Sequence, residues 1–190
     1  YSILQLLYII AKYNKKRRVI SICSYALPHL RLGAIRDFEN ILIGEGEIIE
    51  KIRNKTENTY EIGNSIVEFF GTDNLAKVHG PRRDILFINE ANHIKYDVYI
   101  QLAIRTREAI FIDYNPTMPF WVHDEIIPKE KHSFIKSTYL DNQFLDQATI
   151  NRIEARRNNE IWWRVYGLGE AAQLVGAILT DWSCLKEGEK

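Results

Sequence analysis

The segment Asp84–Asn92, with the sequence Asp-Ile-Leu-Phe-Ile-Asn-Glu-Ala-Asn, places the strongest constraint on the fold of this chain. Four apolar residues, Ile85 to Ile88, follow one another without a polar break. Such a short run is typical of a strand covered on both faces, as in a parallel sheet between layers of helices. The run ends abruptly at Asn89 and Glu90. Because ligands of open α/β sheets bind beyond the carboxyl ends of the strands, this polar pair is predicted to lie at a binding site.

This layout is that of a Walker B strand. In such a strand the first polar residue, here Asn89, helps to hold Mg²⁺, and the glutamate, here Glu90, polarises the water that attacks the γ-phosphate of ATP. The alternative is a buried strand whose Glu90 only caps the following helix. The segment by itself leaves both interpretations open, because the pattern is short.

Hydrophobic periodicity and turn residues predict alternating helices and strands on both sides of this segment. Ahead of it we expect a buried helix, a strand, a longer helix, a β-hairpin about Gly63–Asn64 and a polar loop, over residues 1–13, 19–25, 28–43, 59–70 and 71–83. After it we expect a helix, a buried strand, a short helix, a last strand and a basic helix, over residues 96–106, 109–113, 120–127, 133–138 and 145–157. The predicted fold is α/β, a three-layer and mostly parallel sheet with helices on both faces and an inserted hairpin.

Composition excludes some classes of function. Lys+Arg and Asp+Glu number 25 each, so the chain as a whole lacks the strongly basic footprint of a dedicated nucleic-acid-binding protein. The two cysteines, Cys23 and Cys184, have no metal-ligand spacing and favour a reducing compartment. The apolar run Ile3–Ala11 is too short to span a bilayer and lacks the features of a signal peptide, so we expect no membrane association.

Five short motifs, in this order and spacing, carry a resemblance to a known family. They are Phe87-Ile-Asn-Glu-Ala-Asn92, Gln101-Leu102 with Arg105-Thr106, Ile112-Asp-Tyr-Asn-Pro116, Ser137-Thr-Tyr-Leu-Asp-Asn142 and Tyr166-Gly-Leu-Gly-Glu170. Together they resemble the ATPase domain of the large terminase subunit of tailed bacteriophages, over about Tyr1 to Trp182. No single motif is decisive, and the specificity comes from the series.

The resemblance implies a P-loop NTPase-like fold and a role in a viral DNA-packaging motor. The parent protein would hydrolyse ATP with Mg²⁺ and translocate double-stranded DNA into a procapsid. Its partners would be the portal protein, the small terminase subunit and further copies of itself in a ring, in the host bacterial cytoplasm. A nuclease domain would follow the ATPase domain.

The resemblance also implies roles for individual residues. Glu90 would be the catalytic carboxylate, and Asn89 would stand at the position that binds Mg²⁺ indirectly. Asn115, with its neighbours Asp113 and Thr117, would form a motif that couples hydrolysis to domain movement. A basic residue that reaches the nucleotide of a neighbouring subunit would come from the loop after the hairpin, where the candidates are Lys77, Arg82 and Arg83.

Three departures from the family pattern stand out. The Walker B position holds Asn89, which brings no charge, and His79 stands where the trans-acting arginine is expected. No G-x-x-x-x-G-K-[ST] sequence occurs in the chain, so a Walker A loop is absent from it. We therefore expect residues 1–175 to form an ATPase domain truncated at its amino end, residues 176–190 to lead toward an absent nuclease domain, and the fragment alone to be inactive. A helicase-like P-loop ATPase and an inactive prophage remnant remain as alternatives.

Overall fold

The computed structural model describes residues 1–171, and the chain divides after Tyr114 into two compact units, Tyr1–Tyr114 and Asn115–Lys190. Each unit is considered by itself. The predicted domain end near residue 175 and the segment 176–190 lie outside the described residues.

A six-stranded mixed sheet forms the centre of the first unit, in the order β2-β3-β4-β1-β5-β6. The four strands β4, β1, β5 and β6 are parallel, and β2 and β3 add an antiparallel edge. The strand bounds are β1 Val19–Ser24, β2 Arg53–Asn54, β3 Thr59–Ile62, β4 Ser65–Gly71, β5 Arg83–Ile88 and β6 Thr106–Ile112. The predicted mostly parallel α/β sheet is therefore confirmed.

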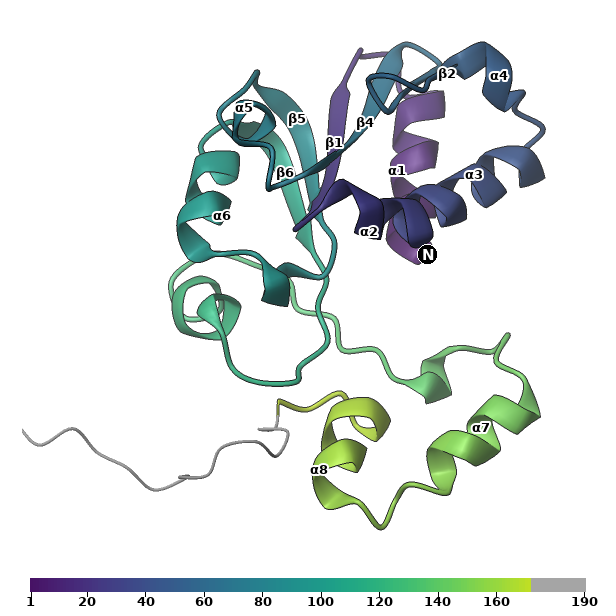
Figure 1. Cartoon of the computed structure of the whole chain (residues 1–190), viewed down its shortest axis with the longest axis vertical. Helices are drawn as coiled ribbons and strands as arrows, with labels where there is room; N and C mark the ends of the chain where they lie inside the picture. The colour runs from purple at the N-terminus through teal and green to yellow at the C-terminus, as the bar shows by residue number, and fades with distance from the viewer. Residues whose placement is uncertain (172–190) are drawn as a thin grey trace, which may run out of the picture. The chain divides into compact units, whose positions relative to one another are not determined.

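Helices cover both faces of this sheet. Figure 1 shows α1, α2 and α3 on one side of the strands and α5 and α6 on the other. Their bounds are α1 Ser2–Tyr13, α2 Leu27–Leu32, α3 Ala34–Gly44, α4 Ile49–Ile52, α5 Leu75–Val78 and α6 Tyr96–Ala103, and a short 3₁₀ helix, η1, spans Ala91–His93. Among the described residues, no helix is both long enough and apolar enough to cross a membrane.

The main core fills the space between the sheet and α1–α3. Alternate side chains of β1, Ile20 and Ile22, point into it, as the period of two along a strand requires. Phe38 of α3 is fully buried and lies against the rings of Tyr60 and Phe69, at 5.5 Å from each centroid. This cluster packs α3 against β3 and β4 of the sheet.

Three local predictions for the first unit need correction. The helix expected over residues 28–43 is interrupted at Gly33, whose φ of −119° and ψ of −96° separate α2 from α3. The hairpin is present, with Gly63 at its turn, but β4 is an integral strand that pairs in parallel with β1. The loop expected over residues 71–83 contains the short helix α5, which Asn74 caps by accepting a hydrogen bond from the Lys77 N–H.

The second unit is built of short helices in the described residues. They are η2 Val122–Ile126, η3 Tyr139–Asp141, α7 Gln147–Glu154, α8 Glu160–Trp162 and η4 Trp163–Gly167. The strand predicted over residues 133–138 is wrong, because that segment finds no strand partner in the part of the chain that the structure describes. Ile135 is 88% exposed, and Thr138 instead forms a capping box with Asp141 at the start of η3.

Candidate functional site at the carboxyl ends of β5 and β6

The polar ends of β5 and β6 meet at one corner of the sheet. The two strands pair in parallel through Ile88 and Ile112, so the residues that follow them are neighbours. The Asp113 N–H donates to the Ile88 carbonyl at 3.1 Å, and the Asn89 N–H donates to the Cys23 carbonyl of β1 at 2.8 Å. The structure therefore brings together Asn89, Glu90 and Asp113, as expected for the carboxyl ends of parallel strands.

Asp113 bonds to three consecutive residues of this corner. The Asn89 amide nitrogen donates to both carboxylate oxygens of Asp113 at 3.1 Å. The Glu90 main-chain N–H donates to Asp113 Oδ1 at 2.6 Å, and the Ala91 N–H donates to the Asp113 carbonyl at 2.9 Å. Burial raises the pKa of Asp113 above its usual value, and the hydrogen bonds from Glu90 and Asn89 oppose that rise. These donors favour the charged form of the carboxylate and so act against the effect of burial.

Glu90 adopts a left-handed backbone conformation, with φ and ψ both 57°. For a residue with a side chain beyond glycine this conformation costs about 1 kcal/mol or more, and such residues concentrate at functional sites. The conformation turns the chain sharply at the end of β5, so the Glu90 side chain leaves the strand at the sheet's carboxyl edge. This observed strain favours a functional role for the residue.

The Glu90 side chain makes no capping hydrogen bond to the helix η1 that follows it. Its carboxylate oxygen Oε2 lies 3.4 Å from His29 Nε2 and 3.9 Å from His93 Nε2, and the side chain remains 35% exposed. The structure thus gives no support to the capping alternative. It shows a partly open carboxylate with two imidazoles beside it, which is an arrangement that can accept a proton from water.

The residues of the corner fit a magnesium ion that is held chiefly by a nucleotide. Among residues 1–171 no three His, Cys, Asp or Glu side chains are grouped so that they could hold a metal by themselves. Mg²⁺ usually binds through one or two protein oxygens, waters and substrate phosphates, so such a group is not required. Since the amide nitrogen of Asn89 faces Asp113, its side-chain oxygen Oδ1 remains to accept a hydrogen bond from a water bound to Mg²⁺.

The three basic candidates of the α5–β5 segment differ in exposure. Arg82 is exposed. The Lys77 side chain is 33% exposed, and its Nζ lies 3.6 Å from Glu57 Oε2. Arg83 is buried, with 1% of its surface exposed, and its guanidinium donates to the carbonyls of Lys77 at 3.3 Å and Pro81 at 3.5 Å. In this conformation Arg83 cannot extend toward another molecule, so Arg82 and Lys77 are the accessible candidates.

We predict that Arg83→Met leaves the free energy of unfolding unchanged within about 1 kcal/mol, or raises it. Two guanidinium nitrogens, Nε and Nη1, are buried without an acceptor in the described structure, so the charge is held at a cost in desolvation. An apolar side chain of similar volume removes that cost. Thermal or denaturant unfolding measures the change, and a loss above about 3 kcal/mol, the size expected for breaking a buried charge pair, would contradict the prediction.

The remaining two predicted residues, Asn115 and Thr117, belong to the second unit. The Thr117 N–H donates to the Asn115 carbonyl at 2.8 Å, which closes a tight turn around Pro116. Asn115 is exposed. Their role in coupling stays a prediction.

Besides His93, sequence reasoning missed two residues near Glu90, namely Tyr25 and His29. The Tyr25 ring lies 5.2 Å from the His29 ring and 5.8 Å from the His93 ring. Both residues follow β1, which lies beside β5 in the sheet. The rule that places ligands beyond the carboxyl ends of parallel strands applies to β1 as well as to β5 and β6. Applied to β1, this rule could have identified Tyr25 and His29.

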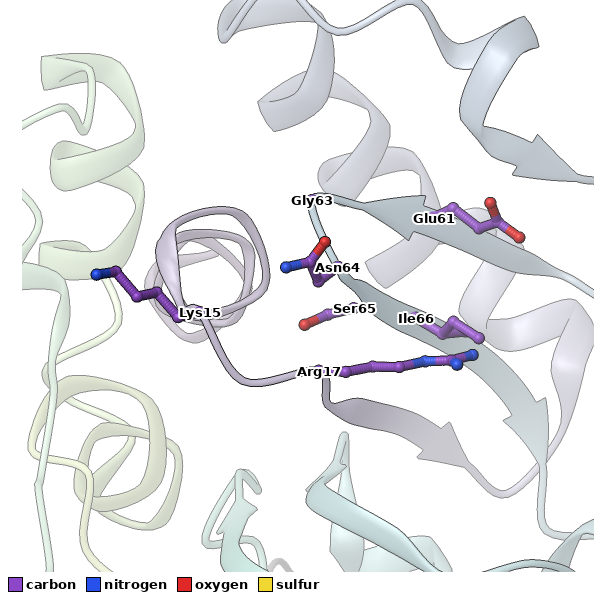
Figure 2. A pocket seen from close by; sticks show the side chains of 7 residues that line it. All are labelled: Lys15, Arg17, Glu61, Gly63, Asn64, Ser65 and Ile66. Atoms are coloured by element: carbon purple, nitrogen blue, oxygen red, sulfur yellow. The ribbon is translucent and has the colours of Figure 1, made fainter.

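A shallow pocket lies at the opposite edge of the sheet, where β1 begins and β3 turns into β4 (Figure 2). Its lining includes Lys15, Arg17, Asn64 and Ser65, and Glu61 is its one acidic residue. In Figure 2 the Lys15 side chain points away from Asn64 and Ser65. The pocket therefore does not gather groups for catalysis, and the carboxyl edge remains the candidate site.

Known proteins resemble this chain in sequence and in fold. The family model described as phage terminase large subunit matches residues 47–170 of the chain. No curated protein matches.

Solved structures show the same fold. The large terminase from a thermophilic bacteriophage, in complex with ADP, has a TM-score of 0.73 at 16% identity, covering 89% of this chain and 44% of that one. The complex of the same terminase with ATP-gamma-S has a TM-score of 0.72 at 16% identity, covering 89% and 43%. The Thermus phage P74-26 large terminase ATPase domain has a TM-score of 0.53 at 11% identity, covering 87% and 81%. The chain thus spans less than half of the first of these terminases, and at these identities the likeness establishes the fold.

Proposed function

Since the chain belongs to the phage terminase large subunit family, we propose that its parent protein hydrolyses ATP to drive double-stranded DNA into a procapsid. The observation that carries the proposal is the strained corner at which Glu90 leaves β5 beside Asp113. The ADP and ATP-gamma-S complexes of the similar thermophilic-phage terminase support ATP as the substrate. The chain covers 44% of that terminase, so we propose the activity for a complete large terminase subunit.

In this mechanism Glu90 orients a water molecule and accepts its proton as the water attacks the γ-phosphate. Its side chain is open enough to reach water, and the turn at the end of β5 aims it past the sheet's edge. Bound Mg²⁺ would neutralise phosphate charge, and the Asn89 carbonyl oxygen would hold it through water. An amide carries no charge, so we expect weaker Mg²⁺ binding than at an Asp in this position.

We also propose the wider assembly of this family for the parent protein. It would act as a ring of identical subunits on the portal protein, with the small terminase subunit delivering DNA, in the host cytoplasm. Arg82 or Lys77 would reach the nucleotide of the neighbouring subunit, because both are accessible in the described structure. ATP turnover that rises with subunit concentration and DNA would support this arrangement.

We predict that Asn115→Ala in the full-length protein preserves ATP hydrolysis but reduces DNA packaged per ATP. Asn115 is the first residue of the second unit and follows Asp113 by two residues along the chain, so in this proposal it transmits the effect of hydrolysis rather than orienting the attacking water. ATPase and packaging assays on the same preparation provide the measurement. Normal DNA yield per ATP would remove Asn115 from the coupling role.

An assay of the full-length protein tests the inactive alternative, which the uncharged Asn89 favours. A DNA-stimulated ATPase activity would reject a prophage remnant without turnover. Its absence in a folded, ring-forming preparation would reject the proposed function itself.

A further inference from the structure

Asp113 stands out because nearly all of its polar atoms bond to the segment that carries Glu90. Its carboxylate accepts the Glu90 N–H and the Asn89 amide, and its main-chain carbonyl accepts the Ala91 N–H. The bond to the Glu90 N–H is the shortest of these, at 2.6 Å. A short bond from a main-chain N–H to a carboxylate is a charge-assisted one, and such bonds are about twice as strong as neutral ones.

The donor of this shortest bond is Glu90, the residue whose backbone is strained. A left-handed residue other than glycine persists only where its surroundings hold it in place. At Glu90 the holding groups are the Asp113 carboxylate on its own N–H and the Asp113 carbonyl on the next one. The Glu90 carbonyl also accepts the His93 N–H at 3.1 Å, but that bond lies within η1. Without the side-chain bond, the Glu90 N–H loses its acceptor.

We propose that Asp113 is a positioning residue, which fixes the left-handed conformation of Glu90 and thereby the direction of its carboxylate. Asp113 touches no reacting atom in this role. The inference rests on the proposed ATPase function and deepens it, because Asp113 at the end of β6 would then orient the catalytic carboxylate of Glu90 at the end of β5. The first unit ends at Tyr114, one residue after Asp113, so the same contact lies next to the link between the units.

Asp84 provides a matched control at the other end of β5. It is buried, and its carboxylate likewise accepts a main-chain N–H, that of Val19 of β1, at 2.9 Å. It lies at the amino end of the strand, away from Glu90. Asp84→Ala and Asp113→Ala therefore each remove a bond between a carboxylate and a main-chain N–H, at opposite ends of β5.

The test compares full-length wild type, Asp84→Ala, Asp113→Ala and Asp113→Asn. Asp113→Ala is expected to lower kcat about 100-fold per folded molecule with little change in KM for ATP, because a small misplacement of a catalytic group costs that much. Asp113→Asn retains an oxygen that can accept the Glu90 N–H, so it should stay within about tenfold of wild type. Asp84→Ala should reduce the folded fraction only.

Hydrogen exchange provides a readout independent of catalysis. The Glu90 amide should exchange at least about tenfold faster in Asp113→Ala, while the Ala91 amide, bonded to the main-chain carbonyl, serves as the internal reference. Equal turnover in Asp113→Ala and Asp84→Ala, or no recovery in Asp113→Asn, would overturn the inference while leaving the proposed function intact. An inactive wild type would instead overturn the proposed function.

Discussion

Replacing Glu90 with Gln in the full-length protein is expected to reduce ATP turnover by about 100- to 10,000-fold, the range that a positioned general base contributes. The substitution keeps the size of the side chain and its hydrogen-bonding atoms, but it removes the charge that draws a proton from water. It also leaves the strained backbone with a residue of the same shape, so the corner itself should persist. Nucleotide affinity should change by less than about tenfold, because the lost group acts on the water.

Steady-state hydrolysis and equilibrium nucleotide binding measure the two effects separately. Glu61→Gln is the control, since it makes the same chemical change on an exposed position of β3 at the other edge of the sheet. Turnover of Glu90→Gln within about tenfold of wild type, a barrier change of only ~1.4 kcal/mol, would remove Glu90 from the catalytic role. Loss of nucleotide binding together with turnover would point to a collapsed site.

Elements whose signal is local could be predicted from the sequence. The apolar run before Asn89 predicts β5, and two β-rich runs about Gly63–Asn64 predict the β3–β4 hairpin. The rule for carboxyl ends of parallel strands then brings Asn89, Glu90 and Asp113 to one corner. These predictions hold because a buried strand and a tight turn each leave their own pattern in the residues.

Features that depend on distant partners could not be predicted. The hairpin gives no sign that β4 pairs with β1, because that pairing joins segments far apart in the chain, such as Val19 with Ile66. The pattern of residues 133–138 suggests a strand, but a strand forms only where a neighbour accepts its hydrogen bonds. The break at Gly33 was missed because a glycine inside a helical pattern is tolerated in many helices.

Arg83 shows how local structure overrides residue type. A pair of arginines in a polar loop predicts exposure for both, yet Arg83 begins β5 and its guanidinium lies 5.4 Å from the Phe70 ring centroid. β5 is buried along its whole length, and its pairing with β6 shifts register between Arg83 and Ile85. The exact residue at which a buried strand begins leaves no sequence signal of its own, so the difference in burial between Arg82 and Arg83 was not predictable.

Among the substitutions considered, one in the main core has the largest expected effect on the free energy of unfolding. Phe38→Ala is predicted to lower the free energy of unfolding by about 3–5 kcal/mol, as for other buried aromatic truncations. The ring is fully buried and packs edge-on against Tyr60, at an interplanar angle of 78°, while Tyr60 and Phe69 contact each other at 5.7 Å. Removing it takes one ring out of a cluster of three mutually contacting rings between α3 and the sheet.

The matched variant is Phe38→Leu, which fills most of the volume and should cost less than about half as much. Denaturant unfolding at unchanged slope measures both differences. Because the cluster lies away from the Asp113–Glu90 contact, hydrolysis per folded molecule in the full-length Phe38→Leu protein should match wild type. A loss below about 1 kcal/mol in Phe38→Ala would show that α3 closes over the vacated space, and that the strands carrying the site do not depend on this cluster for their register.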